Sequence, residues 1–405
     1  MRKTRHVAVL IEASRAYGRG LIRGVAQYYR EHAHWTIWFK PLGLDEMPPP
    51  WLLRWQGDGI LARIANRRMA NAVLRLGVPA VELRGSLSGL PLPFIGVDNR
   101  GVAQIALDHL LGRGLQDVAF CGLRRGEYKR LDERCDHFVQ LAKEAGVPCD
   151  VFPTSASRRR SKDWDEDIEE LAKWVGSLPK PVGIMTCNDD RGLECLEACR
   201  RAGIDVPEQA AVVSVDNDEY MCALSTPPLS SIDVDTYSIG YEAAALLDRI
   251  MADRVPEDHS RYEKLVPSGH VVVRQSSDML ATDDQTVVQA LAFIRQHACD
   301  SIGLSDVVRH VAVSRAALES RMKRVTGHTV YQEIQRVRME KVKELLRETD
   351  LSLKQIALDC GFRYTQHLAR VFRQVTDKTL SEYRKDVNRR NSIFRSTQGH
   401  LDEGM

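Results

Sequence analysis

The sequence predicts a two-lobed α/β region that is followed by an all-α region with two helix-turn-helix motifs. Three observations lead to this prediction. Short apolar runs alternate with helical stretches over the first 275 residues, a helix-turn-helix pattern occupies the last quarter of the chain, and a second copy of that pattern precedes it. With 405 residues, the chain is long enough for two or three domains, each with a core of its own.

The α/β prediction depends on the alternation of strands and helices. The expected strands are 6–12, 36–40, 59–62, 80–83, 94–97, 118–122, 182–187 and 212–215. The expected helices between them include 19–31, 102–112, 135–145, 165–175 and 192–201. Such alternation is typical of parallel sheets that are covered by helices. The number of units is too large for one compact sheet, so we expect two α/β lobes.

Polar side chains follow several of these strands, at the edge where open α/β sheets bind ligands. The loop after the first strand contains Ser14, Arg15 and Tyr17, and the last two strands lead into Asn188 and Asp216. Arg donates hydrogen bonds, Asp accepts them and Asn does both, so this set suits the vicinal hydroxyls of a sugar. Each Asp or Asn alone is more often a helix cap, so the hypothesis of a sugar site requires that the set converges.

The stretch from Leu351 to Thr376 has the pattern of a helix-turn-helix. Ile356 lies on the inner face of a short helix, and Gly361 supplies the sharp turn that ends it. Thr365 is expected to cap a second helix, whose apolar side is formed by Leu368, Val371, Phe372 and Val375. The other side carries groups that contact base edges and phosphates, namely Arg363, Tyr364, Gln366, His367, Arg370, Arg373 and Gln374. A solvated polar face is the alternative interpretation.

A similar pattern runs from Leu304 to Gly327. Ser314 is expected to cap a helix whose inner face is Leu318, Met322 and Val325 and whose outer face presents Arg315, Arg321, Lys323 and Arg324. The two predicted caps lie 51 positions apart, and residues 330–348 between the motifs have apolar side chains at helical spacing. A helix of about 18 residues is roughly 27 Å long. This length is close to the ~34 Å between successive major grooves on one side of a duplex, so one chain would fill two adjacent grooves.

Residues of about 286–388 resemble the DNA-binding domain of the AraC family. The residues that carry the resemblance are Ile356-Ala357, Gly361-Phe362, the triplet Val371-Phe372-Arg373, and the segment from Ser381 to Arg384. The chain departs from the family pattern at four positions. Asp377 and Leu380 stand where the family usually has Gly and Pro, and Val308 and Met322 replace an Ala and a Phe of the first motif. The resemblance implies binding to double-stranded DNA.

The first 277 residues resemble the effector domain that LacI-type repressors share with periplasmic sugar-binding proteins. The matching segments are Val97–Val102, His109–Gly114, Asn188–Asp189, Ala202–Pro207 and Val213–Asn217. This resemblance implies a two-lobed domain that closes on a sugar and pairs with a second copy in a homodimer. It also assigns sugar contacts to Arg134, Asn188, Asp189 and Asp216, in addition to the loop residues Ser14, Arg15 and Tyr17.

The order of the two regions is informative as well, because a LacI-type effector domain normally follows a small DNA-binding head. An effector domain that precedes an AraC-type domain is similar to the arrangement in the xylose-responsive regulators of the AraC family. That resemblance implies D-xylose as the effector, activation of pentose-catabolism genes and contact with RNA polymerase. Two alternatives stay open, a regulator of the same architecture that senses another sugar or a catabolic intermediate, and a sugar-modifying enzyme with a DNA-binding tail.

Charge and length support this division. Residues 285–395 contain 21 Lys and Arg against 12 Asp and Glu, whereas the rest of the chain contains 36 against 43. A basic region on an acidic body fits a polyanionic partner at one end of the molecule. We expect a sugar sensor domain at 1–277, a linker at 278–285, a DNA-binding domain at 286–390 and a flexible tail at 391–405.

Other classes of protein find little support. No segment approaches the ~18 apolar residues of a membrane span, and the apolar run at 7–11 is too short for a signal peptide. Nine cysteines without a C-x-x-C pair indicate buried thiols in a reducing cytoplasm rather than a metal site. There is no phosphate-binding loop, and Leu87 stands where a nucleophile elbow needs Ser. We therefore expect no catalytic residue, cofactor or metal.

Overall fold

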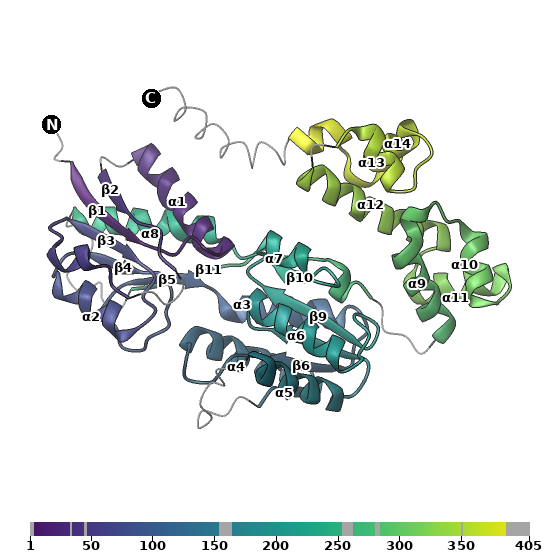
Figure 1. The fold of residues 1–405 in the computed structure, drawn as a ribbon, viewed down its shortest axis with the longest axis horizontal. Helices are drawn as coiled ribbons and strands as arrows, with labels where there is room; N and C mark the ends of the chain where they lie inside the picture. The colour runs from purple at the N-terminus through teal and green to yellow at the C-terminus, as the bar shows by residue number, and fades with distance from the viewer. Residues whose placement is uncertain are drawn as a thin grey trace. The chain divides into compact units, whose positions relative to one another are not determined.

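The computed structural model describes residues 4–32, 35–43, 47–153, 164–252, 262–279, 284–349 and 351–385. The chain divides into two compact units, Met1–Met279 and Leu280–Met405, which are drawn in Figure 1. The first unit is a two-lobed α/β structure and the second is all-α, as the sequence predicts. Part of the expected linker, residues 280–283, and the whole expected tail at 391–405 lie outside the described residues.

The first lobe is built on a parallel sheet with the strand order β11-β5-β4-β3-β1-β2. Its strands are β1 (Arg5–Leu10), β2 (Trp35–Phe39), β3 (Gly59–Ala62), β4 (Ala80–Glu82), β5 (Phe94–Val97) and β11 (Glu263–Val266). The helices of this lobe are α1 (Ala16–His32), α2 (Arg67–Arg75) and α8 (Thr236–Met251), with a 3₁₀ turn at Pro50–Arg54. Helix α8 comes late in the chain and packs beside α1.

The second lobe has a sheet of the order β12-β10-β9-β8-β6-β7, in which only β12 is antiparallel to its neighbour. Its strands are β6 (Asp117–Cys121), β7 (Cys149–Val151), β8 (Val182–Thr186), β9 (Ala210–Val215), β10 (Ser230–Ile232) and β12 (Val271–Val272). The helices are α3 (Asn99–Leu111), α4 (Lys129–Glu144), α5 (Trp164–Ser177), α6 (Asp189–Arg201) and the short α7 (Glu219–Leu224).

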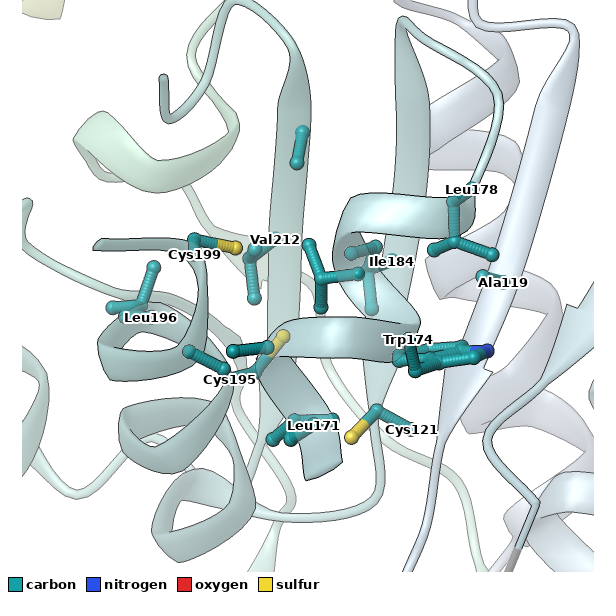
Figure 2. Packing of buried hydrophobic residues seen from close by; sticks show 14 of the residues in the cluster. Ala119, Cys121, Leu171, Trp174, Leu178, Ile184, Cys195, Leu196, Cys199 and Val212 are labelled. Atoms are coloured by element: carbon teal, nitrogen blue, oxygen red, sulfur yellow. The ribbon is translucent and has the colours of Figure 1, made fainter. Parts of the chain in front are cut away.

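The central strands are buried on both faces, because helices cover both sides of a parallel sheet. All residues of β8 and β9 are buried, which explains why these strands are continuous apolar runs in the sequence. Figure 2 shows one side of this core, where Leu171 and Trp174 of α5 and Cys195, Leu196 and Cys199 of α6 gather near Ile184 and Val212 of the sheet. The cysteines of this cluster are free thiols that pack as small apolar groups.

The chain passes between the lobes three times, and each passage is short. The first leads from β5 to α3 through Asp98, whose carboxylate caps α3 by accepting hydrogen bonds from Arg100 N and Gly101 N. The second leads from β10 to α8 and the third from β11 to β12. These three connections join the lobes side by side and leave a cavity between the carboxyl ends of their strands.

Each of the eight predicted strands corresponds to one of β1 to β6, β8 and β9, with ends that differ by at most two residues. The prediction missed β7, β10, β11 and β12, and the helices that it named do not include α2, α7 and α8. The missed strands have two to four residues, and three of them, β7, β10 and β11, carry Asp, Ser, Glu or Lys. Such a short strand is stabilised by pairing with a neighbouring strand. Its sequence has no apolar run long enough to predict a strand.

The second unit contains six α-helices among its described residues. They are α9 (Gln285–His297), α10 (Leu304–Val311), α11 (Arg315–Thr326), α12 (Val330–Glu348), α13 (Leu353–Asp359) and α14 (Thr365–Thr376), with a 3₁₀ turn η3 at Ala298–Asp300. One core gathers α9, η3, α10 and α11 against the first half of α12. A separate core gathers α13 and α14 against its second half, with Leu380 also buried. The leucine that replaces the family's proline is therefore a core residue.

The predicted N-cap of α11 is confirmed, and the predicted N-cap of α14 is wrong. Ser314 caps α11, since its hydroxyl accepts a hydrogen bond from Ala317 N at 3.2 Å. Helix α14 already includes Thr365, and its N-cap is Tyr364, whose side chain makes no capping bond. Val375 was expected on the apolar side of α14 but is 57% exposed, because no described element covers the last turn at that position.

The turns of the two helix-turn-helix motifs differ in strain. Helix α13 is followed by Gly361 at φ +73°, whereas α10 ends at Ala312, which adopts φ +53°. A left-handed conformation costs a residue with a Cβ about 1 kcal/mol, and Ala312 is exposed and contributes no packing. The substitution Ala312→Gly is therefore expected to raise the free energy of unfolding by about 0.5–1 kcal/mol.

Thermal or urea unfolding of the full chain, followed at the transition of the helical unit, measures this effect. The matched control is Ala316→Gly, which removes the same methyl group from an exposed position inside α11 and is expected to destabilise by about 1 kcal/mol. Equal destabilisation by both substitutions would contradict the strain at Ala312.

Candidate functional site

A cavity of about 360 Å³ lies between the two lobes of the first unit. Its volume falls within the ~300–1,000 Å³ of small-molecule sites. The lining residues come from the strand ends and helix starts of both lobes: Glu12, Arg15, Tyr17, Arg63, Arg84, Ser86, Phe94, Gly96, Val97, Asn99, Leu123, Tyr128, Arg130, Leu131, Arg134, Asn188, Asp190, Arg191, Glu194 and Asp216. The lining combines apolar and aromatic surfaces with guanidinium and carboxylate groups.

Arg134 of α4 is fixed at the wall of the cavity. It is 4% exposed, its Nε donates to Asn99 Oδ1 at 2.9 Å, and its Nη1 donates to the carbonyl oxygen of Cys187. Asn99 is the first residue of α3, so α3 and the end of β8 together hold this guanidinium. A buried charge with fixed donors is preorganised for a ligand that brings oxygen atoms.

Asp216 faces Arg134 from the end of β9. It adopts φ +105°, and Asn217 follows at φ +48°. Non-glycine residues in such conformations cluster at functional sites, where the surrounding structure holds the strain. Burial raises the pKa of Asp216 to about 7, and Arg134 opposes this shift through its charge. The carboxylate therefore changes its charge close to neutral pH.

Tyr17, at the start of α1, presents its ring to Arg63 from the loop after β3. The guanidinium carbon of Arg63 lies 4.5 Å from the ring centroid. Arg63 also forms an ion pair with Glu12, and burial lowers the pKa of Arg63 to about 9. Its Nε atom is buried and has no hydrogen-bond partner among the described residues. Tyr17, Arg63 and Glu12 thus form one polar wall from the first lobe.

The lobes contact each other at two sides of the cavity. On one side, Arg15 donates to both carboxylate oxygens of Asp190, at 2.7 and 3.2 Å, and Ala16 N donates to Asp218 Oδ2 at 2.7 Å. On the other side, Arg130 of α4 donates to Glu263 of β11 at 2.6 Å. These direct contacts join the two lobes across the cavity.

Two residues that were expected to contact a sugar do not line the cavity. Ser14 is exposed to solvent. Asp189 is 2% exposed and lies behind the wall, where its carboxylate accepts hydrogen bonds from Asp218 N at 2.7 Å and from Ser231 Oγ at 2.6 Å. Asp189 therefore holds Asp218, which in turn contacts the first lobe. The lining residue of this pair is the adjacent Asp190.

In the second unit, α14 presents an exposed polar face. Arg363, Tyr364, Gln366, Arg370, Arg373 and Gln374 are exposed, and Thr365 and His367 are half-buried. His367 packs edge-on against Phe362, with ring centroids 5.6 Å apart, so it contributes to the core as well. Arg370 forms no ion pair with any described residue. Leu368 and Phe372 on the opposite face are fully buried, as predicted.

Helix α11 and its N-cap present a smaller set of exposed polar groups. Ser314, Arg315 and Lys323 are exposed. Arg321 Nη1 and Arg324 Nη2 each donate to a different oxygen of Asp284, both at 3.1 Å. Asp284 is the N-cap of α9, where its side chain accepts a hydrogen bond from Val287 N. The expected DNA contacts of Arg321 and Arg324 would compete with this carboxylate.

Three models of known domains match consecutive parts of the chain. They are the "XylR N-terminal domain" at residues 6–99, the "Periplasmic binding protein-like domain" at 107–277 and the "Helix-turn-helix domain" at 307–386. The "Xylose operon regulatory protein" of Escherichia coli K12 is 32% identical over 395 residues, which cover 95% of this chain and 98% of that protein. The chain belongs to the family of xylose operon regulatory proteins.

Other members of this family support the assignment. The protein of the same name in Haemophilus influenzae is 31% identical over 93% of this chain and 97% of its own length. A solved structure described as the xylose-binding transcription activator xylR is 31% identical, superposes with a TM-score of 0.75, and covers 95% of this chain and 98% of that one. The chain is therefore a transcription regulator with a DNA-binding domain of the helix-turn-helix type. None of the helices in its described part has the length and apolarity needed to cross a membrane.

For this member of the family, sequence reasoning reached Arg15, Tyr17, Arg134, Asn188 and Asp216, all of which line the cavity. It missed Arg63, Asn99 and Arg130, among others, and it assigned a sugar contact to Asp189 rather than to the adjacent Asp190. Arg63 directly follows β3, so the rule that ligands bind beyond the carboxyl ends of strands would have found it. Asn99 and Arg130 act through contacts with distant residues, and no local pattern marks them.

Proposed function

We propose that D-xylose is the effector of this regulator, that it binds in the cavity between the lobes, and that its binding activates genes of pentose catabolism. The observation that supports this proposal is the convergence of Arg15, Tyr17, Arg134, Asn188 and Asp216 on one cavity. Guanidinium, amide and carboxylate groups match the hydroxyls of a pentose, and the aromatic ring of Tyr17 matches its C–H face. The names of the relatives point to the same sugar.

Sugar binding is proposed to favour the closed arrangement of the lobes, because contacts from both lobes to one ligand exist only there. The contacts of Arg15 with Asp190 and of Arg130 with Glu263 would add to the stability of that arrangement. In this proposal the protein acts in the cytoplasm as a homodimer, closure reorients the DNA-binding units, and these then contact RNA polymerase. It has no enzymatic role, so the sugar is released unchanged.

The experiment that tests the effector is a calorimetric titration of the full chain with D-xylose, L-arabinose, D-ribose and D-glucose. Binding of D-xylose that is at least about tenfold tighter than binding of each of the other three sugars supports the proposal. Selective binding of another sugar would identify that sugar as the effector. Absence of binding to all four sugars would favour a catabolic intermediate as the effector. Recovery of unchanged D-xylose after incubation separates a sensor from a sugar-modifying enzyme.

The affinity for D-xylose is expected to rise with pH around neutrality. Burial raises the pKa of Asp216 to about 7, and the groups that act on it are Arg134, Arg63, Asp189 and Asp190. The ionised carboxylate accepts charge-assisted hydrogen bonds from hydroxyls, and the protonated form does not. Between pH 6 and pH 8 the ionised fraction rises from about 0.1 to about 0.9, so affinity is expected to increase by up to about tenfold.

Calorimetric titrations with D-xylose at pH 6, 7 and 8 measure this dependence. Asp216→Asn carries no titrating group at the position and is expected to bind weakly with the same affinity at all three values. A wild-type affinity that is constant from pH 6 to pH 8 would contradict the assignment of Asp216 as a charged acceptor.

A further inference from the structure

Two cysteines meet where the two halves of the DNA-binding unit join. Cys299 lies in η3, which belongs to the first helix-turn-helix half, and Cys360 is the C-cap residue of α13 in the second half. The thiol of Cys360 has the largest influence on the pKa of Cys299, so the two side chains are neighbours. The backbones are also close, since a Cβ added at Gly361 would lie 2.9 Å from the carbonyl oxygen of Cys299. Both cysteines are free thiols in this structure.

The surroundings give the two thiols different pKa values and different exposure to solvent. The hydrogen bond from Cys360 lowers the pKa of Cys299 to about 7, with support from the positive charges of Arg338 and Lys341, while burial and Asp300 oppose the shift. The same hydrogen bond raises the pKa of Cys360, which is fully buried. Cys299 is only partly buried and thus accessible. An accessible thiolate beside a protonated thiol is the arrangement of an attacking and a resolving cysteine.

Arg338 also fixes the geometry of this junction. Its guanidinium donates from Nε to the carbonyl oxygen of Ala298 at 2.7 Å and from Nη2 to that of Ile302 at 3.0 Å. Arg338 lies in the middle of α12, the helix that connects the two halves. It therefore holds the backbone on both sides of Cys299 against the connecting helix. The close approach of the backbones at Cys299 and Gly361 is thus part of the packing of the domain.

We propose that Cys299 and Cys360 are a redox-sensitive modification site that forms a reversible disulfide when the protein meets a hydroperoxide. The Cys299 thiolate attacks one oxygen of hydrogen peroxide, the O–O bond breaks, and the second oxygen leaves as hydroxide and takes up a proton to become water. Cys299 is then a sulfenic acid. The sulfur of Cys360 attacks it, the S–O bond breaks, and the thiol proton leaves with the hydroxyl group as a second water.

The disulfide links the two helix-turn-helix halves covalently. Without it, the only covalent connection between them is the chain that runs through α12. The recognition helices α11 and α14 belong to different halves and different cores, so the link restrains their relative orientation. It also closes a long loop of chain. The thermal midpoint of the helical unit is therefore expected to rise by at least about 5 °C on oxidation, and a dithiol reductant is expected to reverse the change. This site is independent of the effector.

The test uses the full wild-type chain, hydrogen peroxide, alkylation of the remaining thiols and peptide mass spectrometry. The expected product is a linked pair of peptides that contain Cys299 and Cys360, and dithiothreitol removes the link. Cys149 is the internal control, because it is also partly buried but burial raises the pKa of its thiol to about 12. Cys299 is expected to react at least about 100-fold faster than Cys149.

Two variants assign the roles of the cysteines. In Cys360→Ala, peroxide is expected to leave a sulfenic acid at Cys299 that dimedone traps. In Cys299→Ser, Cys360 is expected to stay reduced. Equal reaction rates for Cys299 and Cys149 in the wild-type chain would overturn the proposal, and so would oxidation of Cys299 to the sulfinic acid without any link to Cys360. Both outcomes are read from the wild-type protein, so they hold even where a variant folds poorly.

Discussion

Replacing Asp216 with Ala is expected to weaken D-xylose binding by at least about 100-fold and to leave DNA binding without sugar unchanged. The side chain lies at the cavity wall and faces the buried Arg134. A hydrogen bond to a charged group contributes about 1.5–3 kcal/mol, and two hydroxyls of the sugar would lose such a partner. The free energy of unfolding is expected to change little, because burial raises the pKa of this carboxyl and its removal relieves the cost of desolvation.

Calorimetry with D-xylose and anisotropy with a DNA fragment selected from a random library measure the two activities of this variant. Asp205→Ala is the matched control, since it removes an exposed carboxylate of the same lobe that does not line the cavity. We expect this control to behave as wild type in both assays. Normal D-xylose binding by Asp216→Ala would show that the sugar site lies elsewhere.

Replacing Arg370 with Ala is expected to reduce DNA affinity by about 10- to 100-fold and to leave sugar binding intact. Arg370 lies on the exposed face of α14 and has no ion pair with a described residue, so its guanidinium is available to a base edge or a phosphate. A specific base contact contributes about 1–3 kcal/mol. Arg321 and Arg324 are already held by Asp284, so Ala at either position is expected to have a smaller effect.

Anisotropy titrations at several salt concentrations distinguish the two kinds of contact. Loss of a phosphate contact reduces the slope of log affinity against log salt by about one, and loss of a base contact changes the preferred sequence. Arg249→Ala is the matched control, because it removes the same charge from an exposed position of the sensor unit. If Arg249→Ala weakened DNA binding as much as Arg370→Ala, net charge rather than the face of α14 would be responsible.

The fold was predictable from sequence where apolar runs are long. Strands β8 and β9 are buried over their whole length, and α12 spans Val330–Glu348, the same range in which the sequence has apolar side chains at helical spacing. The missed strands β11 and β12 come from the end of the sensor unit and pair with strands far back in the chain. Their pairing is decided by tertiary structure, so local pattern carries little information about it.

The candidate site was predictable only in part, for a similar reason. Asp216 was reached from its position after a predicted strand and Arg134 through the family resemblance, but which of two adjacent carboxylates faces the cavity depends on how α6 begins. Its N-cap is Asn188, and this start turns Asp189 toward Ser231 behind the wall and Asp190 toward Arg15. In the same way, the pairing of Arg321 with Asp284 joins positions that are 37 residues apart, and no spacing in the sequence indicates it.

The central claim is that sugar binding in one unit controls DNA binding in the other. The most direct test is the affinity of the full chain for its selected DNA fragment, measured by anisotropy with and without saturating D-xylose. We expect D-xylose to increase the affinity by at least about fivefold, and the DNA to increase the affinity for D-xylose by the same factor, since coupling is reciprocal. Equal DNA affinity in the presence and absence of a sugar that calorimetry shows to be bound would contradict the claim.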